Sequence, residues 1–474
     1  MIQVDATLRQ RTGLQYVLDL LHPVTPYGAE RVRRLRFYAP GEGAALADAW
    51  HNVAEAMRAL AETPDLCARL ERLLMPLRDI RGTLHRLDET ILTEVELFEV
   101  KRFLLQLEQI APLWAQMGDG FRGLAITDES AALALLDPDG RRAAGFAVRS
   151  AELHIIIEEK RLLEAELRVV QSDNRPALLA RRAELCAREE RANLTERARL
   201  TEALRPFAAA LMANIATLGA LDFTLQQAKL ARARGGVRPR ITESTLSFTE
   251  MDYPPVADAL LERGRGFTRL SIDAPEGVAV ITGANMGGKS VVLRALALEL
   301  LLCHAGFFAL AASASLPLLD GLWLSGEDLA DAAGGLSTFG AEVVSLQRHI
   351  AAIDAGGRYF WALDEPARGT NPQEGAALVG ALVRRLAGMR SFAVVATHFD
   401  GAARDAQAHY QAAGLRPLPE KLPDTDRQAL LAAHMAYGLR PVPRDAKPPH
   451  DALTVCRLLG LDAAVVGDMA ARLQ

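Results

Sequence analysis

The sequence predicts a multidomain protein with an all-α N-terminal half and a C-terminal α/β domain that binds a nucleotide. Two observations lead to this prediction. Apolar residues in the first half recur with the period of amphipathic helices, and the second half contains a glycine-rich phosphate loop followed by two further buried-strand patterns. The chain has 474 residues, 50% of them hydrophobic. That length is enough for about two or three domains with cores of their own.

Residues 1–145 are predicted to form a domain of helices joined by short turns. Apolar side chains between Leu14 and Leu21 share one helical face, a proline-containing break follows, and residues 44–60 resume the period. Composition alone supports an all-α packing domain and nothing more specific.

Residues 146–235 are predicted to form two long helices. An apolar stripe runs through residues 153–170, residues 173–176 interrupt it, and a second stripe continues to Leu225 with a kink expected at Pro206. The pattern by itself is equally typical of an ordinary helical hairpin.

Basic residues are most concentrated over residues 229–240, around Gly235 and Gly236. The glycines favour a solvated interdomain linker there. The whole chain has 54 Lys and Arg against 59 Asp and Glu, a formal net charge of −5. This balance lacks the basic excess that is typical of nucleic-acid-binding domains, although it does not exclude nucleic acid as a partner.

The C-terminal domain, residues 236–474, is organised around a phosphate loop. Residues 278–281 are a buried-strand pattern, a helix follows, and the segment between them, Gly283 to Ser290, fits G-x-x-x-x-G-K-[ST]. Backbone N–H groups of such a loop surround phosphate oxygens, its lysine neutralises the β- and γ-phosphates, and its hydroxyl binds Mg²⁺. The residues expected to bind the nucleotide here are Gly283, Asn285, Met286, Gly287, Gly288, Lys289 and Ser290.

Two further strand patterns end in residues suited to hydrolysis. The first ends in Asp364 and Glu365, and the second is followed by His398. The Asp364 carboxylate could bind Mg²⁺ through a water molecule, and Glu365 could orient the attacking water. A neutral His398 imidazole could form a hydrogen bond with the γ-phosphate or with that water. One such pattern alone is more often structural. Asp364, Glu365 and His398, in this order after one phosphate loop, together predict a catalytic site.

These motifs resemble those of the MutS family of ABC-type ATPases. The loop GANMGGKS resembles the phosphate loop of the family, with Ala284 where proline is usual, and residues 335–339 (GLSTF) resemble its serine-bearing signature. Residues 364–370 (DEPARGT) resemble its Walker B segment. The resemblance implies ATP and Mg²⁺ as cofactors and a homodimer. It also implies that Ser337 and Thr338 complete the nucleotide site of the partner subunit.

The resemblance extends to the rest of the chain more weakly. Residues 17–35 and 70–87 are similar to the helical core domain of the family, residues 146–235 to its lever arms, and residues 453–473 to its C-terminal dimerisation helices. The mismatch-recognition, connector and clamp domains are expected to be absent. The role of the proline-rich residues 407–440 stays open.

The sequence predicts a soluble cytoplasmic protein without a membrane segment. Its N-terminus lacks the basic-then-apolar order of a signal peptide. Four scattered cysteines are expected to be reduced structural thiols; they are Cys67, Cys186, Cys303 and Cys456.

Two functional classes remain open for this ATPase. The first is a DNA mismatch repair-type, DNA-binding ATPase that clamps nucleic acid between its lever arms. The second is a chaperone-like ATPase that acts on a protein partner, because short MutS-like proteins resemble the factor implicated in reactivating an adenosylcobalamin-dependent aminomutase. Family membership favours the first class, and the acidic balance favours the second. Any DNA binding is expected to lack mismatch selectivity, since a domain that could carry an aromatic wedge is missing.

Overall fold

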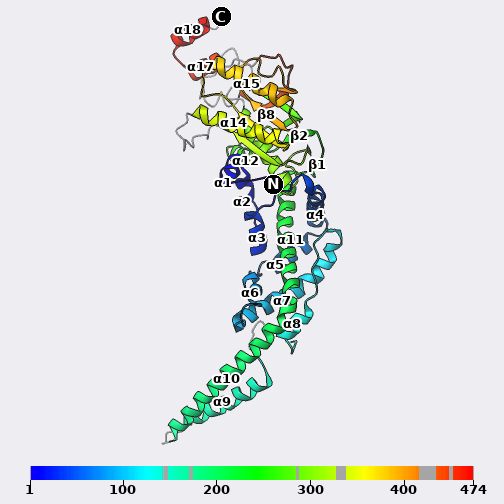
Figure 1. Ribbon diagram of the computed structural model, residues 1–474, viewed down its shortest axis with the longest axis vertical. Coiled ribbons are helices and arrows are strands. Elements are labelled where there is room, and N and C mark those ends of the chain that lie inside the picture. Colours follow the sequence, from blue (N-terminus) through cyan, green and yellow to red (C-terminus); the bar gives the residue numbers. More distant parts are fainter. Residues whose placement is uncertain are drawn as a thin grey trace. The chain divides into compact units, whose positions relative to one another are not determined.

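The computed structural model describes residues 2–140, 142, 148–169, 174–283, 288–326, 338–415, 434–447 and 452–472. They form helices and two β-sheets (Figure 1), which confirms the mixed helical and α/β fold class. Two compact units are present. The sheet unit comprises Met1–Leu21, Leu35–Met57 and Gln227–Gln474, and the helical unit comprises His22–Arg34 and Arg58–Gln226. Two N-terminal segments therefore pack with the C-terminal half, and the periodicity of those segments does not indicate this.

The described part of the helical unit consists of helices and their connections. Residues of α4 (Gly43–Glu62) and α11 (Ala208–Arg234) belong to both units. The other described helices of this unit are α3 (Pro26–Arg33), α5 (Pro64–Leu74), α6 (Arg81–Arg86), α7 (Glu94–Met117), α8 (Ser130–Leu136), α9 (Ala151–Val169) and α10 (Arg175–Leu204). The short helix α8 packs on α7.

A buried carboxylate joins the start of α3 to α11. Asp222 is 0% exposed and accepts three hydrogen bonds, from the Thr25 hydroxyl (2.6 Å), the Thr25 N–H (2.8 Å) and the Val24 N–H (3.1 Å). The Thr25 hydroxyl in turn accepts from the Gly28 N–H, so Thr25 caps α3 while Pro26 occupies its first turn. The predicted break before residue 26 is thus a capped helix start.

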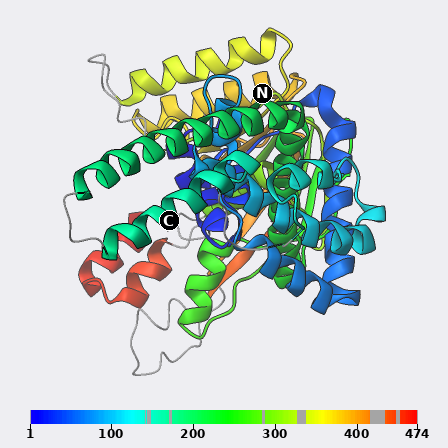
Figure 2. The same ribbon diagram turned by 90° about the horizontal axis from the view of Figure 1, so that it is seen from below.

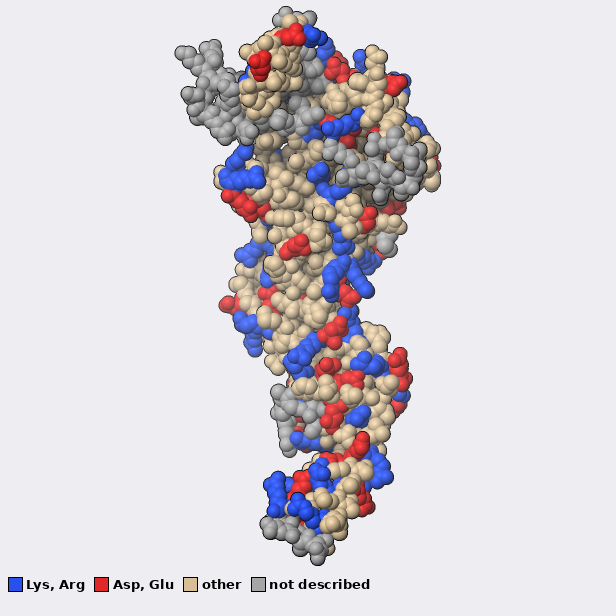
Figure 3. Space-filling view, turned by 90° about the vertical axis from the view of Figure 1, so that its left-hand side faces the viewer, with Lys and Arg blue, Asp and Glu red and all other residues tan. Residues whose placement is uncertain are grey.

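The helices α9 and α10 pack against each other, and ion pairs cross between them. In Figure 3 basic and acidic side chains interleave over this hairpin. The pairs are Lys160 with Glu189, Arg182 with Glu164 (3.2 Å) and Arg188 with Glu159 (3.5 Å). Much of the positive charge of the hairpin therefore already has an acidic neighbour.

The kink expected at Pro206 is confirmed. The helix α10 ends at Leu204, and a short 3₁₀ turn, η3 (Arg205–Phe207), separates it from α11. Proline has no N–H to donate within an α-helix, so the ladder of hydrogen bonds stops there.

The linker predicted over residues 229–240 is wrong for residues 229–234, which belong to α11, whereas residues 235–239 connect α11 to β1. Lys229 and Arg234 lie in the last turns of α11, and Arg234 donates to the Asp258 carboxylate (2.7 Å). Basic residues are favourable at a helix C-terminus because they face the carbonyl end of its dipole. Gly235, with φ of +67°, follows the helix, as is usual for its C-terminal residue.

The sheet unit contains a six-stranded sheet of order β10-β9-β4-β8-β7-β6 and a four-stranded sheet of order β1-β5-β2-β3. In the larger sheet all neighbours are parallel except β9 and β10. Its strands are β4 (Gly277–Thr282), β6 (Gly321–Ser325), β7 (Tyr359–Asp364), β8 (Phe392–Ala396), β9 (Ala408–Leu415) and β10 (Met435–Pro441). The smaller sheet contains β1 (Arg240–Ile241), β2 (Thr245–Met251), β3 (Leu270–Pro275) and β5 (Ser313–Leu316).

The two strands β9 and β10 come from the segment 407–440 whose role the sequence leaves open. They pair antiparallel and extend the sheet beyond β4. Residues 416–433 of this segment lie outside the described residues.

Helices cover the larger sheet. Side chains of α14 (Thr338–Asp354) and α15 (Pro372–Ala387) form a core with β4, β7 and β8, and these two helices lie next to each other in Figure 2. The helix α13 (Lys289–His304) follows β4 and is buried along nearly its whole length. The remaining described helices are α1 (Ala6–Thr12), α2 (Leu14–Asp19), α12 (Pro254–Glu262), α17 (Ala452–Leu459) and α18 (Ala463–Arg472).

One helical run, Arg175–Arg234, contains an 18-residue window with a mean hydropathy of 1.5, and 56% of that window is buried in the structure. Core helices of soluble proteins have the same length and composition, so this window is weak evidence for a membrane span.

Candidate functional site

Three neighbouring strands bring the predicted catalytic residues to one edge of the six-stranded sheet. The ends of β4, β8 and β7 are in register, with Ile281 opposite Ala396 and Ala396 opposite Asp364. Backbone hydrogen bonds continue past the strands, from the Thr397 N–H to the Ile281 carbonyl (3.0 Å) and from the Glu365 N–H to the Ala396 carbonyl (2.9 Å). The carboxyl ends of adjacent parallel strands are where nucleotides bind in open α/β sheets.

The phosphate-loop lysine is held inside this edge. Lys289 is 3% exposed, its Nζ donates to the Gly283 carbonyl (2.7 Å), and it lies 3.6 Å from Glu365 Oε1. Burial lowers the pKa of Lys289, and the neighbouring Glu365 opposes that shift. Gly283 has φ of +136° and Gly288 has φ of +81°, a region that favours glycine.

The carboxylate of Asp364 fits a metal that is bound through oxygen. Burial raises the pKa of Asp364, while a hydrogen bond from the Ser290 hydroxyl lowers it. Its Oδ1 atom is buried and has no hydrogen-bond partner among the described residues. Such an orphaned acceptor beside a hydroxyl suits Mg²⁺, which takes one or two protein oxygens and completes its shell with phosphate and water. Within the described residues no group of three or more His, Cys, Asp and Glu side chains could hold a metal, so phosphate would have to supply further ligands.

Glu365 and His398 lie next to each other and are more exposed than Lys289. The Nδ1 atom of His398 is 4.0 Å from Glu365 Oε1, and its ring lies against Phe399 with centroids 4.5 Å apart. Glu365 has φ of +49°, an uncommon backbone conformation for a residue other than glycine. Strain of this kind concentrates at functional sites.

Part of the predicted site lies outside the described residues. Asn285, Met286, Gly287 and Ser337 belong to that part, and Thr338 is described only as the first residue of α14. Their assigned roles stay predictions.

An apolar pocket beside the phosphate loop was missed by sequence reasoning. It has a volume of about 150 Å³ and lies between Gly288 at the start of α13, Phe267 ahead of β3 and Tyr437 on β10. The apolar side chains of Val292 and Leu260 also line this pocket. An apolar-walled pocket next to a phosphate cradle has the chemistry to hold a nucleobase. The only sequence signal for this pocket is that Phe267, an aromatic residue, lies shortly before the strand that leads into the phosphate loop.

Tyr253 has a structural role and is not part of that pocket. It is buried, and a β-carbon at Gly13 would lie 3.2 Å from its hydroxyl oxygen, so its ring packs on the turn between α1 and α2.

A second missed residue is Arg11, on α1. A β-carbon at Gly326 would lie 3.1 Å from Arg11 Nη2 and 3.4 Å from Asp364 Cβ. The absence of a side chain at residue 326 therefore lets the Arg11 guanidinium approach the end of β7. Because the two residues are more than three hundred positions apart, only the fold reveals that an N-terminal helix borders the site.

Comparisons with known proteins agree with these motifs. Residues 279–419 match the family model of MutS domain V. The DNA mismatch repair protein MutS of Shouchella clausii (strain KSM-K16) is 30% identical over 248 residues, which are 52% of this chain and 26% of that protein. The DNA mismatch repair protein MutS of Thermus thermophilus (strain ATCC BAA-163) is 36% identical over 195 residues, 41% of this chain and 23% of that protein.

The chain thus spans about a quarter of the length of these curated relatives. The match covers β4, β7 and β8 together with Lys289, Asp364, Glu365 and His398. Residues 279–419 of this chain thus carry a domain that matches MutS domain V.

Proposed function

We propose that the protein is a MutS-type ATPase that binds and hydrolyses ATP with Mg²⁺. The observation that carries this proposal is the meeting of Lys289, Asp364, Glu365 and His398 at one sheet edge, with Asp364 Oδ1 buried and lacking a partner among the described residues. A structural ion-pair cluster would satisfy that oxygen.

Each residue has a distinct role in this proposal. The phosphate-loop backbone and Lys289 bind the phosphates, and the pocket of Phe267 and Tyr437 binds the base. Ser290 and Asp364 would hold Mg²⁺, which supplies charge stabilisation for the transferred phosphoryl group. Glu365 orients the attacking water and accepts its proton, and His398 orients the same water or the γ-phosphate.

Two variants separate binding from hydrolysis. Lys289→Ala should weaken ATP binding, because it removes the buried charge that neutralises phosphate. Glu365→Ala should retain binding and stall hydrolysis, because the phosphate cradle is untouched. Binding is measured with a fluorescent ATP analogue and hydrolysis by phosphate release, with the exposed Lys447→Ala as a matched control. Wild-type turnover no higher than that of Glu365→Ala would contradict the proposal.

We also propose that the active form is a homodimer in which Ser337 and Thr338 complete the partner's site. Exposed Leu459, Leu461 and Val465 on and between α17 and α18 support self-association through these helices. Mixing Lys289→Ala with Ser337→Arg chains should restore one intact site per heterodimer. No recovered activity in a mixture that demonstrably forms heterodimers would contradict the shared site.

In domain terms we propose a core domain over residues 1–145, lever helices over 146–235 and the ATPase domain over 236–474. Nucleotide-driven closure of the dimer would move the lever helices. The cytoplasm is the compartment we propose.

For the client, the family favours DNA, since the relatives are named DNA mismatch repair proteins. A protein client, such as an adenosylcobalamin-dependent aminomutase, is the alternative. The ion pairs that balance the basic residues of α9 and α10 favour it, because paired arginines contribute less to phosphate binding. Binding of the unmodified duplex near physiological salt separates the two clients.

A further inference from the structure

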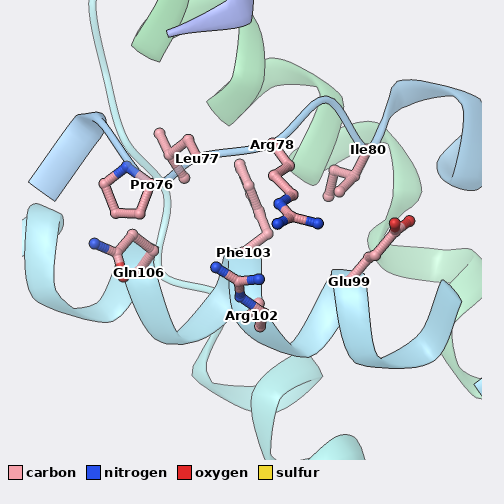
Figure 4. A pocket seen from close by; sticks show the side chains of 8 residues that line it. All are labelled: Pro76, Leu77, Arg78, Ile80, Glu99, Arg102, Phe103 and Gln106. Atoms are coloured by element: carbon pink, nitrogen blue, oxygen red, sulfur yellow. The ribbon is translucent and has the colours of Figure 1, made fainter. Parts of the chain in front are cut away.

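A small pocket in the helical unit brings two arginines together (Figure 4). The connection between α5 and α6 forms one wall with Leu77, Arg78 and Ile80, and α7 forms the other with Arg102 and Phe103. In Figure 4 both guanidinium groups point into the space between the connection and the helix. All residues that line this pocket belong to the helical unit, so it is separate from the nucleotide site.

The backbone that carries Arg78 is anchored independently of its side chain. The Arg78 carbonyl accepts a hydrogen bond from the Tyr27 hydroxyl (2.7 Å), and Leu77 and Ile80 on either side of it are buried. Phe103 is buried on α7 and forms the floor. The backbone at Arg78 and the helix that carries Arg102 are therefore in place before any ligand arrives, which lowers the entropic cost of binding.

The positive charge of the pocket is not neutralised from within. No ion pair to Arg78 or Arg102 is present in the described part of the chain. Glu99, the acidic residue of the pocket, instead accepts a hydrogen bond from the Thr83 hydroxyl (3.2 Å). Each guanidinium carries five N–H donors, and two facing guanidiniums repel until an oxyanion bridges them. The pocket is thus built to accept a negatively charged group.

The size of the pocket decides between kinds of oxyanion. Its volume is about 30 Å³, and each oxygen-sized group needs roughly 10–15 Å³. The pocket therefore has room for about two such groups, which fits the two oxygens of a carboxylate better than the four of a phosphate.

We propose that Arg78 and Arg102 form a carboxylate-binding site. Its ligand is an acidic group of a protein partner or a small free carboxylic acid. Both sources present the same planar oxyanion, which the fork of an arginine binds through two parallel hydrogen bonds.

The test uses the full chain and three probes. Fluorescence anisotropy measures binding of a labelled decaglutamate peptide and of a labelled decathymidylate, and calorimetry measures binding of succinate. Sodium acetate should displace the peptide more effectively than sodium chloride at the same ionic strength. Arg78→Ala and Arg102→Ala should each weaken the carboxylate probe by about tenfold or more.

The matched control is Arg72→Ala, which removes an exposed arginine of α5. It should change the affinity for the carboxylate probes less than twofold, as expected of a surface charge outside the site. Arg78→Lys and Arg102→Lys keep the charge and lose the fork, so their affinities should be intermediate. Circular dichroism confirms that each variant folds.

Pocket-dependent binding of the peptide identifies a protein source, and pocket-dependent binding of succinate alone identifies a small acid. The proposal is overturned if neither carboxylate probe binds the wild type, or if the pocket variants behave like Arg72→Ala. It is also overturned if the pocket variants weaken decathymidylate as much as the carboxylate probes.

Discussion

Asp222 in the helical unit is a fully buried carboxylate and Asp364 in the sheet unit is a partly buried one, and burial raises the pKa of both. They differ in their hydrogen bonds. Asp222 accepts three from Thr25 and Val24, whereas Asp364 has one oxygen without a partner among the described residues. A raised pKa is thus common to a structural and a candidate catalytic acid, and the unmet hydrogen-bonding capacity of Asp364 is what distinguishes it from Asp222.

The largest expected effect concerns Asp364. Asp364→Asn should lower hydrolysis by about 10³-fold, because a carboxylate that binds the metal is replaced by a neutral amide. The free energy of unfolding should stay equal or rise, since the repulsion between Asp364 and Glu365 disappears. Phosphate release and urea unfolding measure the two quantities. A large loss of stability would make Asp364 a structural residue like Asp222.

Asp222→Ala should affect stability rather than hydrolysis. The substitution should lower the free energy of unfolding by about 3 kcal/mol, because it leaves buried N–H and O–H donors without an acceptor. Urea unfolding measures this cost, and Asp88→Ala, at an exposed carboxylate in the same unit, serves as the control. ATP binding per folded molecule should not change. An unaltered stability would show that the network around Thr25 contributes little.

A third prediction concerns pH and two buried groups of α13. Burial raises the pKa of Glu299 to about 8 and lowers the pKa of His304 to about 4. The Glu299 contribution to stability is complete below the unfolded pKa of 4.5 and is lost as the pH rises towards 8. The His304 contribution is complete above the unfolded pKa of 6.5 and is lost as the pH falls towards 4.

Between pH 4.5 and 6.5 the contributions of Glu299 and His304 to the free energy of unfolding change in opposite directions. Between pH 6.5 and 8, of these two groups only Glu299 should change the stability. Stability should fall there by up to about 1.4 kcal/mol per pH unit, or about 2 kcal/mol over the window. Unfolding of Glu299→Gln and the wild type at several pH values checks this. An equal slope in both proteins would assign the pH dependence to other groups.

Arg11 is expected to have a smaller effect than Asp364, because it borders the site without belonging to the phosphate loop. Arg11→Ala should lower kcat by about tenfold, since a positive charge beside the end of β7 is lost. Arg11→Lys should retain more activity, and Arg9→Ala, on the same helix, is the control. Steady-state hydrolysis with full titration of ATP measures both kcat and KM. A change confined to melting temperature would assign Arg11 a packing role.

The smallest expected effect is the difference between paired and mispaired DNA. Phe248, in the one Phe-x-Glu of the chain, is 1% exposed in β2 and cannot stack on a base. A homoduplex and a G·T heteroduplex should bind within tenfold of each other, a difference below about 1.4 kcal/mol, with and without ATP. Titrations at two salt concentrations measure this. A reproducible preference above tenfold for the mismatch would require a recognition element elsewhere.

The sequence by itself determined the part of the site that is local. A buried strand, a glycine-rich loop and a helix start are consecutive in the chain, so spacing alone identifies Lys289, and the same holds for Asp364 and Glu365 at the end of a strand. Parallel strands align their carboxyl ends, and the meeting of these residues followed from that rule. The linker prediction failed for residues 229–234 because a run of arginines is polar in a helix as well as in a loop, and the carboxylate of Asp258, which pairs with Arg234, is distant in sequence.

Only the tertiary structure decided which distant residues share a surface. Arg11 reaches the end of β7 because residue 326 has no side chain, and Phe267 meets Tyr437 beside Gly288 because β10 pairs with β9 across the sheet. Arg78 and Arg102 line one pocket because the connection between α5 and α6, anchored by the buried Leu77 and Ile80, lies beside α7. Such contacts depend on packing between elements far apart in the chain. Hydrophobic periodicity specifies which face of each element is buried, but not which partner covers it.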